Sequence, residues 1–179
     1  FKSNGLSNAI EGDANIRMFM LDQAGNGAST NFQFLIVHNS RRVRLYGDDS
    51  LQLDANAVDI DDSSWHHIAA VRESGTLSLY IDGASRASVS SGTYNYGSSA
   101  NSGSPRPRVG AYASTMGRIT EGSCISNLRI VVGTAIYTGS YTVPTEDLED
   151  TSGCKLLACQ GPSPIYASVI ASGTKATTE

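Results

Sequence analysis

The stretch from Trp65 to Gly83, WHHIAAVRESGTLSLYIDG, constrains the fold more than any other part of the sequence. Apolar residues stand at every second position from Leu77 to Ile81, which is the period of a half-buried β-strand. The apolar run His66–Arg72 precedes that strand, and a Glu-Ser-Gly-Thr turn separates the two. The Asp-Gly pair that ends the stretch is a second hairpin signal, and Ser85–Val89 follows it. The stretch therefore predicts three consecutive antiparallel strands.

Short apolar runs separated by turn residues continue along the rest of the chain. Asn15–Leu21 and Phe32–His38 are apolar enough to be central strands with both faces buried. No long helical apolar period interrupts this pattern, and the 179 residues include 18 glycines. Further strands or extended segments are predicted at Arg42–Tyr46, Leu51–Leu53, Ala57–Ile60, Arg108–Tyr112, Leu128–Val132, Tyr137–Thr145 and Lys155–Gln160. The predicted fold class is all-β, a two-sheet antiparallel β-sandwich.

Two runs of residues resemble a known family. The Trp-His-His opening and the L-x-L-Y-I-D-G strand within Trp65–Gly83 resemble the laminin-G / concanavalin A-like superfamily. The run ISNLRIVVGTAIYTGSYTVPTEDLEDTSGCKLLACQ, Ile125–Gln160, resembles laminin-G-like domains of tailed-bacteriophage structural proteins, particularly marine ones. Together the runs cover about a third of the chain. The resemblance implies a concanavalin A-like jelly roll.

The expected domain organisation is one sandwich over residues 1–160 and a C-terminal extension over residues 161–179. The extension departs from the family, and we expect one further strand at Ile165–Ile170 and then a flexible tail. Phe1–Gly5 resembles the end of a strand that runs into a turn, and a strand of the F-x-F-W-F-K kind precedes such a turn in relatives. We therefore expect the sequence to begin inside a longer protein and to lack the first strand of the sandwich.

The three cysteines cannot all pair within one chain. On one continuous strand Cys154 and Cys159 lie about 16 Å apart and face opposite sides, whereas a disulfide needs Cα atoms within roughly 7 Å. A bond from Cys124 to either remains open, and buried free thiols are the favoured interpretation. Free thiols fit assembly in a reducing cytoplasm.

The segment Ser90–Pro107 is the longest irregular stretch, and it carries two tyrosines in a Gly/Ser-rich context. Tyrosine faces can stack on sugars, and nearby arginine and asparagine side chains can bond the hydroxyl groups. The candidate glycan-binding residues are Tyr94, Asn95, Tyr96, Arg106, Arg108 and Tyr112. The favoured alternative is that these tyrosines fix their loops in place or contact a protein partner.

Asp59, Asp61 and Asp62 form the densest carboxylate cluster, and hard oxygen ligands suit Ca²⁺. Their spacing does not match an EF-hand loop, so acidic turn residues that cap a strand are the commoner interpretation. His66 and His67 are adjacent on a strand and face opposite sides, so they cannot chelate one ion there. We expect these histidines to be structural, with a ring nitrogen bonded to nearby backbone, and we expect no cofactor.

The sequence lacks the motifs that hydrolytic chemistry on this fold needs. There is no E-x-D-x-x-E pattern of the kind that glucanases use, no G-x-S-x-G elbow and no P-loop. The predicted protein is therefore not an enzyme.

The charge and hydropathy of the chain restrict its partners. The net charge is −4 and no basic stripe follows the sequence, which argues against nucleic-acid binding. No apolar run reaches the length of a membrane span. The resemblance implies a virion structural module, in a capsid decoration, head fibre or tail fibre, which contacts other virion proteins and forms a homo-oligomer, with a trimer favoured. The alternative is a carbohydrate-binding lectin domain for host-surface recognition or of a secreted or cell-surface protein.

Overall fold

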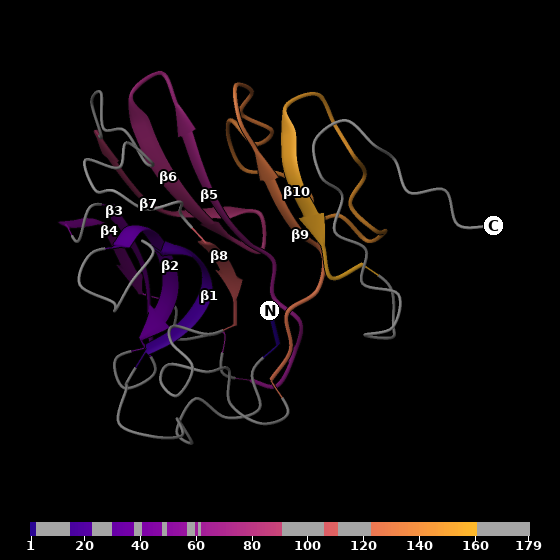
Figure 1. The fold of residues 1–179 in the computed structure, drawn as a ribbon, viewed down its shortest axis with the longest axis horizontal. Coiled ribbons are helices and arrows are strands. Elements are labelled where there is room, and N and C mark those ends of the chain that lie inside the picture. Colours follow the sequence, from indigo (N-terminus) through magenta and orange to yellow (C-terminus); the bar gives the residue numbers. More distant parts are fainter. Residues whose placement is uncertain are drawn as a thin grey trace.

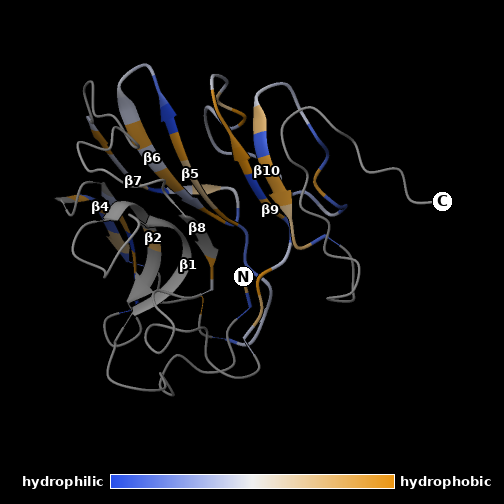
Figure 2. Ribbon diagram, viewed as in Figure 1, coloured by the Kyte–Doolittle hydropathy of each residue, from blue (hydrophilic) through white to orange (hydrophobic). Residues whose placement is uncertain are grey.

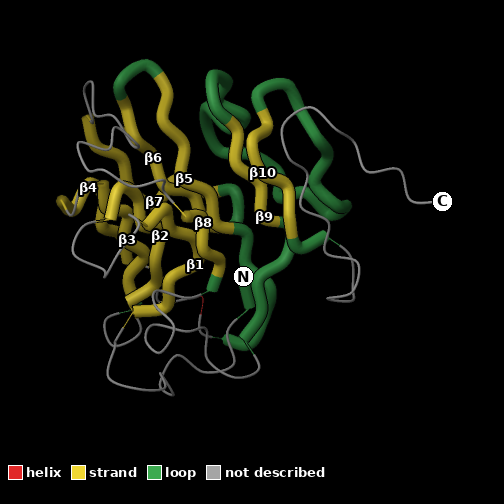
Figure 3. Tube along the Cα trace, viewed as in Figure 1, coloured by secondary structure: helices red, strands yellow, loops and turns green. Residues whose placement is uncertain are grey.

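The computed structural model describes residues 1–2, 15–22, 30–37, 41–47, 50–56, 60, 62–90, 106–110 and 123–160. Within these residues, ten strands joined by loops form two layers that face each other (Figures 1 and 3). Every strand pairing is antiparallel. The predicted all-β sandwich is confirmed.

The first layer is a five-stranded sheet in the order β4-β3-β2-β1-β8. The two strands predicted to be central have neighbours on both sides, as their continuous apolar sequence requires. A β-bulge interrupts the pairing of the first two strands between Arg17 and Phe19. The strands of this layer are β1 (Asn15–Asp22), β2 (Thr30–Val37), β3 (Arg42–Gly47), β4 (Ser50–Asn56) and β8 (Arg106–Val109).

The second layer consists of two separate ladders. One is the meander β5-β6-β7 and the other is the pair β9-β10 (Figure 1). Figure 2 shows that β5 is hydrophobic over most of its length and hydrophilic at its carboxyl end. The strands of this layer are β5 (Ile68–Glu73), β6 (Thr76–Ile81), β7 (Ala84–Ser90), β9 (Leu128–Val131) and β10 (Cys154–Ala158).

Two tight turns form the meander where the sequence predicted them. The turn from β5 to β6 has Ser74 and Gly75 at positive φ, 47° and 79°. The turn from β6 to β7 has Asp82 and Gly83 at φ 51° and 77°. Two consecutive positive φ values match the right-handed twist of the flanking strands.

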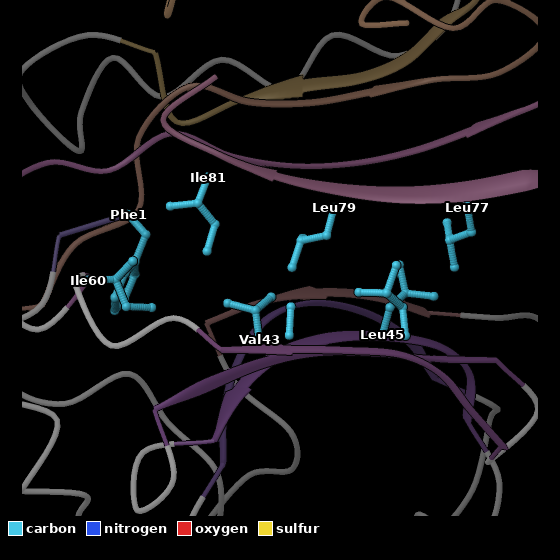
Figure 4. Packing of buried hydrophobic residues seen from close by; sticks show 9 residues of the cluster. Phe1, Val43, Leu45, Ile60, Leu77, Leu79 and Ile81 are labelled. Atoms are coloured by element: carbon cyan, nitrogen blue, oxygen red, sulfur yellow. The ribbon is translucent and has the colours of Figure 1, made fainter. Parts of the chain in front are cut away.

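The core lies between the two layers. Leu77, Leu79 and Ile81 of β6 point toward Val43 and Leu45 of β3, as Figure 4 shows. All five side chains are at most 2% exposed. Other members of the cluster are Phe1, Leu53, Ala55 and Ile60. The alternation from Leu77 to Ile81 therefore assigned the buried face of β6 correctly.

Several sequence-based boundaries were wrong. The strand expected at Arg108–Tyr112 is β8, which begins at Arg106 and ends at Val109. No ladder forms over Tyr137–Thr145, which runs as loop. The strand predicted at Leu51–Leu53 is longer, because all of β4 pairs with β3. Residues 57–59 of the Ala57–Ile60 prediction, and the whole of Ile165–Ile170, lie outside the described residues.

The three cysteines form no disulfide. The strand β10 ends at Ala158, and Cys159 has φ 60°, so Cys154 and Cys159 do not share the one continuous strand that was assumed. The thiols are free as predicted, but they are not buried, because Cys124 is exposed and Cys154 and Cys159 are only partly buried.

Candidate functional site

The segment Trp65-His66-His67 leads into β5 and is held in place by the first residues of the chain. Lys2 forms a β-bridge to Trp65, and the amide of His66 donates to the carbonyl oxygen of Phe1 at 2.8 Å. The amino group of Phe1 donates to the carbonyl oxygen of His66 at 2.9 Å. Trp65 is 55% exposed, although tryptophan is one of the most apolar side chains.

His66 binds two carboxylates, one at each ring nitrogen. Nδ1 lies 2.8 Å from Oδ2 of Asp82, and Nε2 lies 2.9 Å from Oδ1 of Asp62. Asp62 also accepts a hydrogen bond from the amide of Ser64 at 2.7 Å, which fixes its carboxylate in the turn. The imidazole is 9% exposed, whereas the side chains of Asp62 and Asp82 are 53% and 43% exposed.

The two carboxylates favour the doubly protonated imidazolium of His66. Desolvation lowers its pKa, but the hydrogen bonds and charges of Asp82 and Asp62 outweigh that effect, so the pKa of His66 lies above its usual value. The hydrogen bond from His66 lowers the pKa of Asp62, with the Ser64 amide contributing in the same direction. The three side chains form one hydrogen-bonded cluster that favours the charged form of His66.

His67 has the opposite environment. Burial lowers its pKa, so the ring is neutral near pH 7. Its Nδ1 lies 2.8 Å from the hydroxyl oxygen of Tyr141, a residue 74 positions away. Burial raises the pKa of Tyr141, so this phenol keeps its proton, which it can donate to His67.

Two tyrosines pack against the His67 ring, and a third packs against one of them. Tyr137 and Tyr141 stack with ring centroids 3.7 Å apart, and each meets His67 edge to face at 5.6 and 5.5 Å. Tyr80 contacts Tyr141 at 5.6 Å and is 5% exposed. Because Tyr80 alternates with Leu79 and Ile81, it points away from the opposite layer. We call His67, Tyr80, Tyr137 and Tyr141 the outer aromatic cluster.

The Asp82-Gly83 turn contacts His66, His67 and Tyr141. Oδ1 of Asp82 accepts the amide of His67 at 2.9 Å, while its other oxygen binds His66. The amide of Tyr141 donates to the carbonyl oxygen of Gly83 at 3.0 Å. A Cβ at Gly83 would lie 1.9 Å from the carbonyl oxygen of Tyr141, so only glycine permits this approach.

The structure tests few of the predicted glycan-binding residues. Tyr94, Asn95, Tyr96 and Tyr112 lie outside the described residues. Arg106 and Arg108 lie on β8, where they pair with Asp22 and Met20 of β1. The described part of the chain therefore does not bring the predicted set together.

The predicted calcium cluster is also only partly described, since Asp59 and Asp61 lie outside the described residues. Asp62 binds His66 and the Ser64 amide. Among the residues that the structure describes, no group of three His, Cys, Asp or Glu side chains could hold a metal ion.

The sequence predicted structural histidines but not their partners. Backbone acceptors were expected for the rings, whereas both rings bind side chains, which come from Asp62, Asp82 and Tyr141. The Asp-Gly hairpin signal located Asp82 in a turn next to this segment, yet it gave no sign that the carboxylate reaches back to both histidines. Nothing in the local pattern connects Tyr141 with His67.

Comparison with known families gives one match. Residues 8–130 match the family described as the concanavalin A-like lectin/glucanases superfamily, laminin-G type. The match spans more than half of the 179 residues, so the chain belongs to this family of β-sandwich domains. It ends at residue 130 and leaves out most of Ile125–Gln160, the run that resembles phage domains.

Neither the curated proteins nor the solved structures contain a significant match to the chain. The described part of the chain contains no helix that is long and apolar enough to cross a membrane.

Proposed function

We propose that this domain is a non-enzymatic interaction module of a larger assembly. The observation that carries the proposal is the bonding of His66, which uses both ring nitrogens to hold Asp62 and Asp82. An imidazole bonded in this way has no nitrogen left to accept a proton from a substrate. The neighbouring indole of Trp65 is more than half exposed and offers a surface for contact.

The assembly that we propose is a tailed-phage virion, in a capsid decoration, head fibre or tail fibre. The support is the resemblance of Ile125–Gln160 to phage structural domains. Its described loop exposes Val132 and Ile136, 58% and 39% respectively, next to β9. The proposed partners are other virion proteins and further copies of this chain, with a trimer favoured, after assembly in the host cytoplasm.

Three measurements test this function. Multi-angle light scattering of the purified protein should give a mass of three chains, and immunogold electron microscopy should label purified virions. Reducing-sugar release from a panel of β-glucans should stay at background. Turnover that is lost in His66→Gln would contradict the non-enzymatic assignment, and unlabelled virions would contradict the virion assignment.

A lectin function is the second candidate, and the exposure of Trp65 favours it. Indole faces stack on sugars, and the half-exposed carboxylates of Asp62 and Asp82 bind His66, the residue next to Trp65. A glycan array with and without Ca²⁺ separates the candidates. Selective binding that Trp65→Ala abolishes and Val132→Ala retains would establish the lectin, and a need for Ca²⁺ would restore the Asp59–Asp62 site.

A further inference from the structure

The outer face of the five-stranded sheet gathers arginines that are far apart in the sequence. On β3, Val43 and Leu45 are buried in the core between the layers. Successive residues of a strand point to opposite faces of the sheet. Arg42 and Arg44 therefore lie on the face that is turned away from the core.

The strand register extends this face to β1 and β8. Residues that lie opposite each other on paired strands belong to the same face. Arg44 is in register with Arg17 of β1 through the intervening strand β2. Tyr46 is in register with Arg108 of β8 through β2 and β1, and Arg106 lies two positions before Arg108. We call this set the arginine face, and its members are Arg17, Arg42, Arg44, Arg106 and Arg108.

The arginine face carries an excess of positive charge, although the whole chain has a net charge of −4. The register places only two carboxylates on it among the described residues, those of Asp22 and Asp54. Asp54 is shared, because its Oδ1 accepts a hydrogen bond from Nε of Arg42 and its Oδ2 lies 3.3 Å from Nε of Arg44. The side chains of these two arginines are 30% and 28% exposed, so a partner can reach them. Guanidinium groups in excess over carboxylates favour an anionic partner.

The loop between β9 and β10 carries the opposite charge. No lysine, arginine or histidine occurs from residue 132 to residue 150. Residues 146–150, which we call the acidic segment, contain four carboxylates within five positions. All four of these residues are exposed, and they are Glu146, Asp147, Glu149 and Asp150.

Hydrogen bonds from β9 and the residue before it fix the acidic segment in place. The side-chain amide of Asn127 donates to Asp147 at 3.1 Å, and its oxygen accepts the amide of Leu148 at 3.2 Å. Arg129 donates to the carbonyl oxygen of Glu149 at 3.1 Å. A segment that is already ordered loses little conformational entropy when it binds a partner.

The arginine face and the acidic segment cannot meet within one chain. The arginine face is the side of the first layer that is turned away from the core, whereas the acidic segment is bound to Asn127 and Arg129 of the second layer. Figure 1 shows β3 and β4 at one side of the molecule and β9 and β10 at the other. A contact between the two surfaces therefore joins two copies. Such a contact is heterologous, and it ends only where a ring closes.

We propose that the arginine face of one copy binds the acidic segment of the next copy, and that three such contacts close a ring. This inference rests on the homo-oligomer of the proposed function and names the surfaces that form it. The partner is a second copy because the chain itself supplies a fixed group of carboxylates that complements the arginine face. Arginine suits this contact, since its planar guanidinium binds a carboxylate through two parallel hydrogen bonds.

Sedimentation velocity of the purified protein at two salt concentrations tests the charge of the contact. The Debye length falls from about 10 Å at about 0.1 M salt to about 3 Å at about 1 M. We therefore expect a mass of three chains at the lower NaCl concentration and of one chain at the higher. An apolar interface would not weaken in this way.

A double variant, Glu146→Lys with Asp150→Lys, tests the acidic segment. Both side chains are exposed, so the variant should fold as the parent does. It places lysines opposite the arginine face and should weaken the association by about 100-fold or more, which leaves monomers at the lower salt concentration. Glu73→Lys is the control, because it reverses a charge at an exposed residue of the meander, and it should keep the mass of three chains.

Mixing two variants tests whether the contact is heterologous. Arg42→Glu alters the arginine face and keeps the acidic segment, whereas the double variant keeps the face and alters the segment. An equimolar mixture can form one intact contact and should give a mass of two chains, because that contact leaves only altered surfaces free. A mass of three chains in the mixture would overturn the proposal. Where Arg42→Glu does not fold, the double variant and the salt dependence still decide.

The remaining outcomes separate this inference from the proposed function. A mass of three chains that the double variant retains would overturn the inference and leave the proposed homo-oligomer intact. A parent that sediments as one chain at the lower salt concentration would overturn the inference together with the trimer, while immunogold labelling still tests the virion assignment. If that monomer binds a heparin column and Arg42→Glu does not, the arginine face is a site for a free polyanion.

Discussion

The two faces of β6 are stabilised by different kinds of contact. The inner face places Leu77, Leu79 and Ile81 against the opposite layer, and its contacts are apolar. The outer face places Tyr80 in a cluster whose other members come from residues 67, 137 and 141. Apolar packing depends on shape and volume, whereas the outer face depends on directional bonds. A substitution should therefore lower the free energy of unfolding more on the inner face. On the outer face, its effect should depend on which bond or ring contact it removes.

The largest effect is expected for Leu79→Ala on the inner face. Leu79 is 0% exposed, so its truncation removes buried apolar surface and leaves a cavity that its neighbours can fill only in part. Such truncations lower the free energy of unfolding by about 2–5 kcal/mol. Urea unfolding followed by tryptophan fluorescence measures the loss, and Val132→Ala, at a position 58% exposed, is the control. A cost for Leu79→Ala no greater than that of the control would show that the inner face does not carry the stability.

Gly83→Ala tests the close backbone contact between the β6–β7 turn and Tyr141 on the outer face. The added Cβ meets the carbonyl oxygen of Tyr141 at 1.9 Å, and the position has φ +77°. We expect a cost above the roughly 1–3 kcal/mol of a residue forced into the left-handed region, because the loop that carries Tyr141 must also move. Gly133→Ala is the matched control, since φ is +96° and nothing lies within 4 Å of its Cβ. Equal costs in urea unfolding would show that the contact with Tyr141 contributes nothing.

The inner face could be predicted from sequence and the outer one could not. The alternation from Leu77 to Ile81 is local, and burial follows directly from it. Tyr141 belongs to a segment for which an extended structure was predicted and which has no ladder. Its bond to His67 joins residues 74 positions apart, and a single hydrogen bond leaves no periodic signal in the sequence. Asp82 was correctly placed in a turn, but its contacts with His66 and His67 depend on its left-handed φ of 51°.

Tyr141→Phe separates the hydrogen bond of the outer cluster from its ring packing. The variant keeps the stack on Tyr137 and removes the hydroxyl that lies 2.8 Å from Nδ1 of His67. The half-buried nitrogen loses its partner, and the expected cost is about 1 kcal/mol. Tyr137→Phe is the control, because no hydrogen bond of its hydroxyl to a described residue contributes to the cluster. If both variants unfold at the same urea concentration as the parent, ring stacking alone holds the outer face.

The smallest effects are expected from the two histidines, and they should have opposite signs. The pKa of His66 is raised above 6.5, so its contribution is complete below pH 6.5 and is lost as pH rises through the raised value. The pKa of His67 is lowered below 6.5, so its contribution is complete above pH 6.5 and is lost as pH falls through the lowered value. Adjacent residues of the segment before β5 thus give opposite pH slopes, because only His66 faces two carboxylates.

Unfolding midpoints of His66→Gln and His67→Gln from pH 5 to pH 8 test this contrast. The difference between parent and His66→Gln should shrink as pH rises, while the difference between parent and His67→Gln should grow. Asp82→Asn removes one carboxylate from His66 and should flatten the first curve. If the two glutamine variants give parallel curves of midpoint difference against pH, the carboxylates do not stabilise the charged form of His66. The outer face would then differ from the inner one in geometry but not in electrostatics.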